Sequence, residues 1–452
     1  MHSHGRSAVA PLYLFACLLL GGSAQGIWQN AVLQLGGIVL IAWAAATGTP
    51  EPMPRRAKAL LLLAIAAIAI VALQLVPLPQ SLWPQLGRAR IAEGYQLLGQ
   101  PVPRLPLSLT PAASMSTLLC IIPPLALFCA MVRLRAYRET WLAAAVVAGT
   151  LLGIMLGALQ VASSAGGSSW YLYPDTNLGA GVGFFANANH MATLLIVSLP
   201  FLAAALASGK KGNKQHYWAL ASVVAAAALL VIVGIVLNHS LAGYLLVLPV
   251  LMASALLLVR RSRIRWWLGI AVTVSVIGAV GALASSSIGS TRIGQDASAS
   301  VQSRAQILQT TGRAIADYLP FGSGLGSFVN IYRLYESPDA VTSEYVVHAH
   351  NDYAEIALEL GVPGIILMLL FFAWWIPEVR SAWRHGERGG FVKAASIASA
   401  AILVHSVVDF PLRTAAISAC FAMCLALLAG RRTQPARQEP QDLRPARHLV
   451  IR

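Results

Sequence analysis

The sequence contains few charged residues. Asp, Glu, Lys and Arg together make up 11% of its 452 residues, whereas soluble domains contain roughly 25%. Hydrophobic residues make up 57%, and the mean hydropathy is +0.68. This combination excludes a water-soluble globular protein, and it also excludes a disordered chain, which would need low hydrophobicity and high charge. The composition therefore predicts an all-α, polytopic membrane protein.

Cysteine is also scarce, with five residues in the whole chain. All five lie within apolar runs, and no loop contains a pair of them. The sequence therefore predicts neither a disulfide framework nor a thiolate metal site. Cys420 and Cys424 are spaced to share one helix face, and we interpret them as small apolar packing residues.

Long apolar runs, by contrast, are abundant. A transmembrane helix needs about 20 mostly apolar residues, and the sequence contains twelve such runs. They lie at 8–24, 28–46, 58–76, 112–132, 141–162, 189–208, 217–237, 241–259, 266–286, 361–377, 393–409 and 413–429. The first run also has features of a cleavable signal peptide, namely Arg6 and a short apolar stretch. Because many spans follow it, we expect it to be an uncleaved first helix.

Acidic residues are outnumbered, with 17 Asp and Glu against 32 Lys and Arg, which gives a net charge of +15. In a soluble protein this excess would suggest nucleic acid as a partner. In a membrane protein, Lys and Arg gather in the cytoplasmic loops. If both termini are cytoplasmic, most basic residues fall on that side and most acidic residues fall outside. We therefore predict that both termini are cytoplasmic and that the basic surface meets membrane lipids rather than nucleic acid.

The spans divide the chain into four parts. Residues 1–286 are expected to form nine transmembrane helices, and residues 287–360 a large outer loop. Residues 361–430 are expected to form three further helices, and residues 431–452 a disordered basic tail attracted to anionic lipid. Long ordered loops are uncommon unless they are functional, so the outer loop is the expected place for chemistry.

The outer loop is expected to contain a flexible stretch, Thr291–Ser300, and then an amphipathic helix, Val301–Leu319. The apolar residues predicted to share one side of this helix are Ala305, Leu308, Ile315 and Leu319. The glycine-rich segment Phe321–Gly326 follows. No strand precedes it, so the segment favours a tight turn or a close backbone approach over a nucleotide site.

The loop ends in a histidine-led acidic segment, His348–Gly364, directly before an apolar run. Asp352, Glu355 and Glu359 are spaced to share one helical face. The acids are either a solvated cap at the positive end of the helix dipole, or paired and functional groups at the membrane edge. A metal site is possible here, but the spacing differs from that of the known zinc motifs.

Two further outer segments carry polar groups at a similar depth. One opens a span and the other joins the last two spans; their candidate residues are Asn187, Asn189, His190, His405, Asp409 and Arg413. Asp409 and Arg413 are spaced to pair with each other inside the turn, which is the simple structural interpretation. Converging polar groups at the mouth of a helix bundle are alternatively typical of a binding site.

Four of these stretches resemble the bacterial O-antigen ligase and O-antigen polymerase family. They are GFFANANH at 183–190, the region from Arg304 through Phe321–Gly326, HNDYAEIALELGVPG at 350–364 and HSVVDFPLR at 405–413. The resemblance implies a glycosyltransferase of the GT-C type in the bacterial inner membrane, acting at the periplasmic face. It implies a glycan donor linked to undecaprenyl diphosphate, an acceptor on another glycan or on lipid A core, and no metal or other cofactor. It also implies roles for His350 and Arg304.

The chemistry of these residues fits that implied activity. A histidine such as His350 can accept a proton near neutral pH, and Asp352 or Glu355 could orient it. Arg304, with Arg333 as a second partner, could stabilise a leaving diphosphate. The remaining candidate substrate-binding residues are Asn187, Asn189, His190, Asn351, His405, Asp409 and Arg413.

One departure from the family pattern leaves the type of transferase open. Many members carry an arginine after the serine that opens one span, but here Ser240 is followed by Leu241. A polymerase, a ligase and an enzyme that glycosylates protein all remain compatible. The alternative from another class is a twelve-helix secondary transporter or lipid-glycan flippase. Its expected charged or broken helices near mid-membrane are not evident in the sequence.

Overall fold

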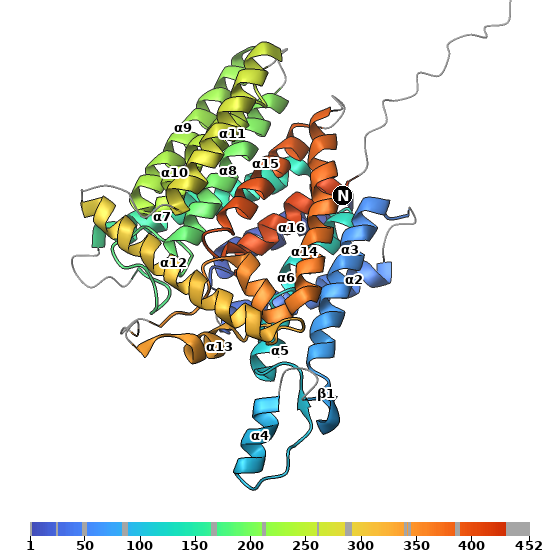
Figure 1. Ribbon diagram of the computed structural model, residues 1–452. Helices are drawn as coiled ribbons and strands as arrows, with labels where there is room; N and C mark the ends of the chain where they lie inside the picture. Colours follow the sequence, from blue (N-terminus) through green and yellow to red (C-terminus); the bar gives the residue numbers. More distant parts are fainter. Residues whose placement is uncertain are drawn as a thin grey trace, which may run out of the picture.

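The computed structural model describes residues 2–23, 26–47, 52–83, 89–163, 170–209, 214–259, 262–284, 292–338, 341, 345–384 and 389–430. Within these residues the chain is helical apart from one antiparallel pair of two-residue strands (Figure 1). The predicted all-α class is therefore confirmed. The predicted tail at 431–452 lies outside the described residues.

The apolar helices form the body of the molecule. They are α1 (His2–Leu20), α2 (Trp28–Thr47), α3 (Arg55–Gln74), α5 (Pro111–Leu119), α6 (Ile122–Val132), α7 (Glu139–Ser163), α8 (Ala188–Ser208), α9 (Lys214–Asn238), α10 (Leu241–Ala255), α11 (Ser262–Ala284), α14 (Asp352–Arg384), α15 (Gly390–His405) and α16 (Ala415–Ala429). Each predicted apolar run falls on these helices. Among the described residues, seven spans are long and apolar enough to cross a membrane, counting α5 and α6 together as one, so the predicted number of twelve is not confirmed.

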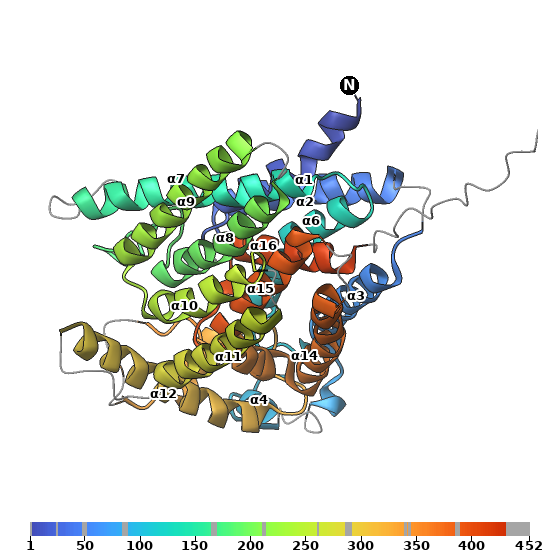
Figure 2. The same ribbon diagram turned by 90° about the horizontal axis from the view of Figure 1, so that it is seen from above.

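The remaining elements lie at the lower end of the bundle in Figure 1. They are β1 (Pro77–Leu78), η1 (Gln80–Leu82), α4 (Ala89–Leu97), β2 (Leu105–Pro106), α12 (Arg292–Tyr318), α13 (Phe328–Tyr335) and η5 (Pro411–Arg413). α4 and the strand pair form a projection, and α12 runs obliquely across the bundle (Figure 1). Figure 2 shows α11 and α12 along one side of the molecule, with α3 and α14 on another.

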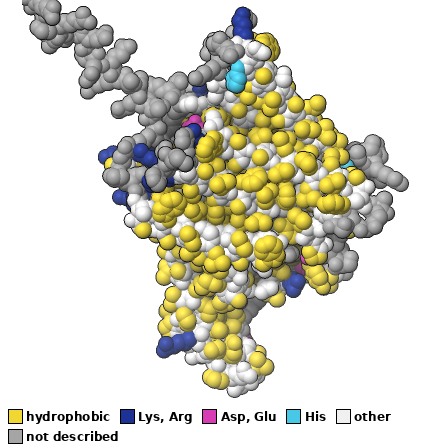
Figure 3. All heavy atoms as spheres, turned by 180° about the vertical axis from the view of Figure 1, so that it is seen from behind, with side chains coloured by type: hydrophobic (Ala, Val, Ile, Leu, Met, Phe, Trp, Pro, Cys, Tyr) yellow, Lys and Arg dark blue, Asp and Glu magenta, His cyan; other side chains and the backbone are white. Residues whose placement is uncertain are grey.

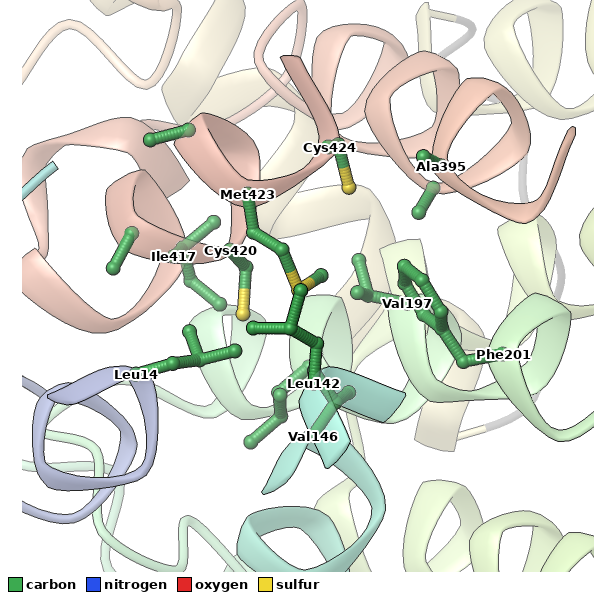
Figure 4. Packing of buried hydrophobic residues seen from close by; sticks show 14 of the residues in the cluster. Leu14, Leu142, Val146, Val197, Phe201, Ala395, Ile417, Cys420, Met423 and Cys424 are labelled. Atoms are coloured by element: carbon green, nitrogen blue, oxygen red, sulfur yellow. The ribbon is translucent and has the colours of Figure 1, made fainter. Parts of the chain in front are cut away.

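The centre of the bundle is packed with small and aliphatic side chains. Leu14 of α1 and Leu142 of α7 point towards Cys420 and Met423 of α16, while Phe201 of α8 lies beside Val197; all are almost fully buried (Figure 4). Helices in lipid associate by close packing rather than by the hydrophobic effect, and the alanine-rich α15 and α16 allow this approach. Cys420 and Cys424 are buried free thiols in this core, as predicted.

The outer surface carries a broad apolar field. Figure 3 shows hydrophobic side chains across the middle of one face, with Lys and Arg at its margins. Large side chains such as Trp218, Leu229 and Val274 are more than 60% exposed. In water such an extended apolar patch would be a liability, whereas a lipid-facing surface requires it.

Two predictions about the outer loop were wrong. The helix α12 begins at Arg292, so helix extends over most of the stretch predicted to be flexible. Its buried residues are Ile307, Thr310, Thr311 and Ala314, whereas Leu308 is 43% and Leu319 41% exposed. The small and hydroxyl-bearing face packs inward against α13 and α14. Arg304 is half-buried and lies one turn before Ile307 on this same face.

α14 is kinked at Gly361, whose backbone (φ 61°, ψ −145°) is non-helical. Backbone N–H groups of the glycine-rich turn bond to the carbonyl groups just before the kink. Ser323 N–H donates to Leu358 O, and Gly324 N–H donates to Glu359 O, each at 2.9 Å. Inside a membrane every backbone group needs such a partner. The glycines of this turn have positive φ and lie against α14 and its neighbours, so the close backbone approach that the sequence favoured is present.

Candidate functional site

The turn between α15 and α16 is fastened to the start of α14. Asp352 N–H donates to Ser406 O at 3.0 Å, and the Ser406 hydroxyl donates to Asp352 Oδ2 at 2.8 Å. Asn351 Nδ2 donates to Val407 O at 2.8 Å, while its own Oδ1 accepts from Ala354 N–H. Two segments that are more than 50 residues apart in the sequence are thus held in register, and the ionisable residues of both meet.

His350 and Asp409 form a buried pair across this junction. His350 Nδ1 lies 3.0 Å from Asp409 Oδ1, and the carboxylate is 1% exposed. Burial alone would raise the pKa of Asp409, but the hydrogen bond and charge of His350, together with the nearby charge of Arg304, hold it well below its usual range. An ionised carboxylate only accepts hydrogen bonds. Nδ1 of His350 therefore carries the hydrogen, and in the neutral ring Nε2 keeps its lone pair.

Arg304 belongs to the same cluster. It reaches the site from the inward face of α12, and its charge acts on both Asp409 and His405. Of the two residues that the resemblance singled out, His350 contacts Asp409 directly, whereas Arg304 acts on the same carboxylate through its charge.

Two fully buried histidines complete this side of the cluster. His405 Nδ1 lies 2.8 Å from the Thr193 hydroxyl, which itself donates to Asn189 O at 2.9 Å. The Thr193 oxygen must accept from His405, so Nε2 of His405 bears a lone pair, and among the described residues that nitrogen has no hydrogen-bond partner. Both ring nitrogens of His190 are also without a partner in the described part of the chain.

Phe410 lies between the histidines. The ring centroids of His190 and His350 are 5.0 and 5.2 Å from its own, both in edge-to-face geometry. His348 lies against the ring at 4.0 Å with an interplanar angle of 32°. One aromatic side chain, 6% exposed, therefore separates and orients three imidazoles.

A second ionic cluster lies on the His348 side. His348 Nδ1 is 2.9 Å from Glu355 Oε1. Arg413 Nη2 is 3.2 Å from Glu355 Oε1 and 3.1 Å from Glu359 Oε2, and its Nε is 3.7 Å from Asp352 Oδ1. Burial alone would lower the pKa of Arg413, but the three carboxylates raise it above its usual value.

This second cluster closes one end of an apolar cavity of about 600 Å³. Its walls come from α3, α5, α6, α14 and α16, with aliphatic and aromatic side chains such as Leu61, Ile68 and Phe371. His348 and Arg413 are among the polar residues that line it. The site is thus an apolar chamber that ends at charged groups next to the His350–Asp409 pair.

Residues 225–369 match the O-antigen ligase family. The matched segment covers about a third of the chain and is similar to that family. This match confirms the resemblance over the segment from α9 to α14, which includes Arg304, His348 and His350. Asp409, Arg413 and His190 lie outside it and are joined to it by the contacts described above. No curated protein matches the chain.

Two interpretations of the acidic segment and its partner turn are corrected by the structure. Asp409 and Arg413 do not pair with each other, because Asp409 binds His350 and Arg413 binds the acids of α14. The acids are not a solvated cap, since Asp352, Glu355 and Glu359 are at most 3% exposed. The kink at Gly361 turns this first part of α14 into the protein, where Arg413 compensates the acids.

Several predicted site residues have local structural contacts. Asn187 caps α8 by accepting from Asn189 N–H at 2.8 Å, and Asn189 Oδ1 accepts from the Ser240 hydroxyl at 2.6 Å. Both groups of Asn351 are used within the junction. Arg333 is exposed on α13 and lies over the Tyr345 ring at 5.2 Å, outside both clusters.

The sequence interpretation missed residues that the structure places at the centre of the site. Phe410 and His348 lie within the segments named above. Neither an apolar residue in a turn nor a histidine without a known partner indicates a site by itself. Gln74 was hidden at the end of an apolar run, yet its amide donates to Glu359 O at 3.0 Å and accepts from Leu325 N–H at 3.2 Å. The only sequence signal for Gln74 is that it is a polar amide within an apolar run.

Among the described residues, no group of three or more His, Cys, Asp and Glu residues has an arrangement that could hold a metal ion. The clusters are instead ion pairs and hydrogen bonds between side chains. Groups of this kind can transfer protons and stabilise charge.

Proposed function

We propose that this protein is a membrane glycosyltransferase that moves a glycan from undecaprenyl diphosphate to a sugar hydroxyl at the periplasmic face of the bacterial inner membrane. The match to the O-antigen ligase family supports ligase- or polymerase-type chemistry in general. The observation that carries the proposal is the His350–Asp409 pair, with Arg304 acting on the same carboxylate.

The pair has the arrangement of a general base. Asp409 accepts the hydrogen of Nδ1, which orients His350 and stabilises the cation that forms when Nε2 takes a proton. The acceptor hydroxyl loses its proton to Nε2 as its oxygen bonds to the anomeric carbon of the donor. The bond between that carbon and the phosphate oxygen breaks, and the diphosphate leaves with its electron pair.

Arg304 is proposed to stabilise the negative charge on the leaving diphosphate. A guanidinium is always charged and offers a rigid set of donors that matches phosphate geometry. Its half-buried position beside Asp409 keeps it close to the base. No metal is needed in this scheme, because a base and a cation supply both requirements of the transfer.

The apolar cavity supports a lipid-linked donor. Its walls are aliphatic and aromatic, and it ends beside the histidines, so an isoprenoid chain inside it would bring its phosphate end to the charged groups. His348, which lines the cavity, and His350 both lie against the ring of Phe410.

The experiment that tests the proposal is deletion of the gene in the strain that encodes the protein, followed by gel analysis of surface polysaccharide. We expect long glycan chains to be lost or to remain unattached, and to be restored by the wild-type gene. Single capped units would identify a polymerase, carrier-linked polymer a ligase, and loss of a glycoprotein band a protein-glycosylating enzyme. An unchanged polysaccharide and glycoprotein pattern would contradict the proposed function.

A further inference from the structure

The site contains two histidine–carboxylate pairs whose imidazoles both lie against Phe410. His350 pairs with Asp409. His348 pairs with Glu355, and Glu355 also contacts Arg413. The first pair serves the proposed base, whereas the second has no part in that chemistry, although it is the pair that lines the apolar cavity.

The second pair presents its donors rather than its acids. The side chains of His348 and Arg413 are 20% and 14% exposed, whereas those of Asp352, Glu355 and Glu359 are 4%, 1% and 0% exposed. Asp352, Glu355 and Glu359 also line the cavity, but their side chains are almost fully buried and hold these donors in fixed directions. In this cluster the exposed side-chain surface therefore comes mainly from the two donors.

We propose that His348, held by Glu355 and supported by Arg413, binds the phosphate end of an isoprenoid diphosphate whose chain occupies the apolar cavity. The inference rests on the proposed function for the identity of the carrier, and it adds a substrate-contacting residue that lies against the same aromatic ring as the base.

Three features of the site favour a phosphate over other polar groups. The Nδ1 atom of His348 faces Glu355, which leaves Nε2 as the second donor when the ring is protonated. Hydrogen bonds from charged donors to phosphate oxygens are among the strongest available to a protein. The cavity behind the donors is apolar, so it suits a phosphate that carries a long hydrocarbon chain rather than a free nucleotide or sugar.

Position also favours this assignment. His348 lies 4.0 Å and His350 5.2 Å from the same ring by centroid distance. A diphosphate beside His348 would place the sugar that it carries next to the face of the site where His350 and Arg304 meet. Binding and proton transfer are thereby divided between two neighbouring histidines.

The test is a binding measurement on the full-length protein in detergent, with no turnover required. The probes are undecaprenyl diphosphate, undecaprenol, which has the same chain without phosphate, and lipid A, which has phosphates on acyl-chain lipid. The variant is His348→Gln, which keeps a similar side-chain length without the positive charge. The control is His216→Gln in the exposed first turn of α9.

We expect His348→Gln to bind undecaprenyl diphosphate about tenfold more weakly, the loss typical of one charge-assisted hydrogen bond. Binding of undecaprenol should be unchanged, which also shows that the variant is folded, and His216→Gln should bind as wild type does. Wild-type affinity in His348→Gln, equal weakening of both isoprenoids, or a His348-dependent preference for lipid A would each overturn the proposal.

This outcome is separable from that of the proposed function. If the wild-type protein transfers no glycan from any undecaprenyl-linked donor but still binds the diphosphate through His348, the proposed function fails and the phosphate site stands. If transfer occurs and the diphosphate affinity is independent of His348, the reverse holds.

Discussion

Replacing Asp409 with asparagine removes one negative charge from the centre of the site while keeping the size of the side chain. In the structure this carboxylate is 1% exposed, binds His350 at 3.0 Å and has the charge of Arg304 nearby. A charge-assisted hydrogen bond contributes about 1.5–3 kcal/mol to stability. The His350 side chain is 25% exposed, so water weakens this bond. We therefore expect Asp409→Asn to lower the free energy of unfolding by an amount near the lower end of this range.

The effect of Asp409→Asn on activity should exceed its effect on stability. General-base catalysis contributes roughly 10²–10⁴-fold to a rate, and a neutral amide can neither fix the Nδ1–H form of His350 nor stabilise its protonated form. We therefore expect glycan transfer by purified protein to fall at least a hundredfold. The matched control is Asp317→Asn, an exposed aspartate of α12 that accepts from the Tyr335 hydroxyl at 2.8 Å.

The pH dependence follows from the direction of the pKa shift. The pKa of Asp409 is lowered in the folded protein, so its stabilising effect is present above the usual aspartate pKa of about 3.9 and is lost only as the pH falls through the lower folded value. Asp409 therefore stays ionised from about pH 5.5 to about pH 8, so a stability difference between wild type and Asp409→Asn should be present at both pH values, measured by thermal unfolding in detergent. A difference that disappears at the lower pH, or a variant that retains more than about a tenth of wild-type transfer, would refute the reasoning.

Three further variants test the rest of the site and its support. Arg304→Lys should reduce glycan transfer at least tenfold because the bidentate donor geometry is lost. The control Arg313→Lys, at an exposed position of the same helix, should retain activity. Equal effects of the two substitutions would contradict the role of Arg304. Gly361→Ala should abolish stable expression, because its backbone conformation is accessible mainly to glycine and Pro320 lies against it, while Gly312→Ala, in open space on α12, should be tolerated. Gln74→Leu should lower the free energy of unfolding by about 1–3 kcal/mol by leaving buried backbone groups unpaired, and unchanged thermal unfolding would show that these bonds contribute nothing.

The apolar body of the fold could be predicted because its signal is local. Each run of apolar residues reports its own helix, and Cys420 and Cys424 report a packed face by their spacing alone. The number of spans could not be predicted from these apolar runs, because runs and helices do not always coincide. α5 and α6 share one run that is broken at Cys120, and α14 begins nine residues before its run at a kink that one glycine permits.

The candidate site could be predicted only as a set of segments. Residue type and position near the membrane edge identified His350 and Asp409 as candidates, and the family resemblance added Arg304 and a role for His350. Their partners could not be identified, because pairing depends on which segments meet in three dimensions. Arg413 is four residues from Asp409 in sequence, yet its charge is compensated by acids from α14, more than 50 residues away.

The inward face of α12 could not be predicted for a related reason. Its buried side carries Ile307, Ala314 and two threonines and packs on an apolar cluster that includes Phe328, so its apolar leucines are no guide to the buried side. Thr310, Thr311 and Ala314 pack inward, while Leu308 remains exposed. Arg304 lies on that inward face, which apolar periodicity alone could not assign.

The central claim, that His350 accepts the proton of the acceptor hydroxyl, is tested most directly by comparing His350→Asn with His239→Asn. Both histidines have a left-handed backbone, with φ of 48° and 58°, which asparagine tolerates. The same exchange therefore removes an imidazole at each position with little backbone strain. Glycan transfer from an undecaprenyl-linked donor is measured with each purified variant. We predict that His350→Asn loses transfer at least a hundredfold while His239→Asn matches wild type; transfer by His350→Asn at the wild-type rate would contradict the account.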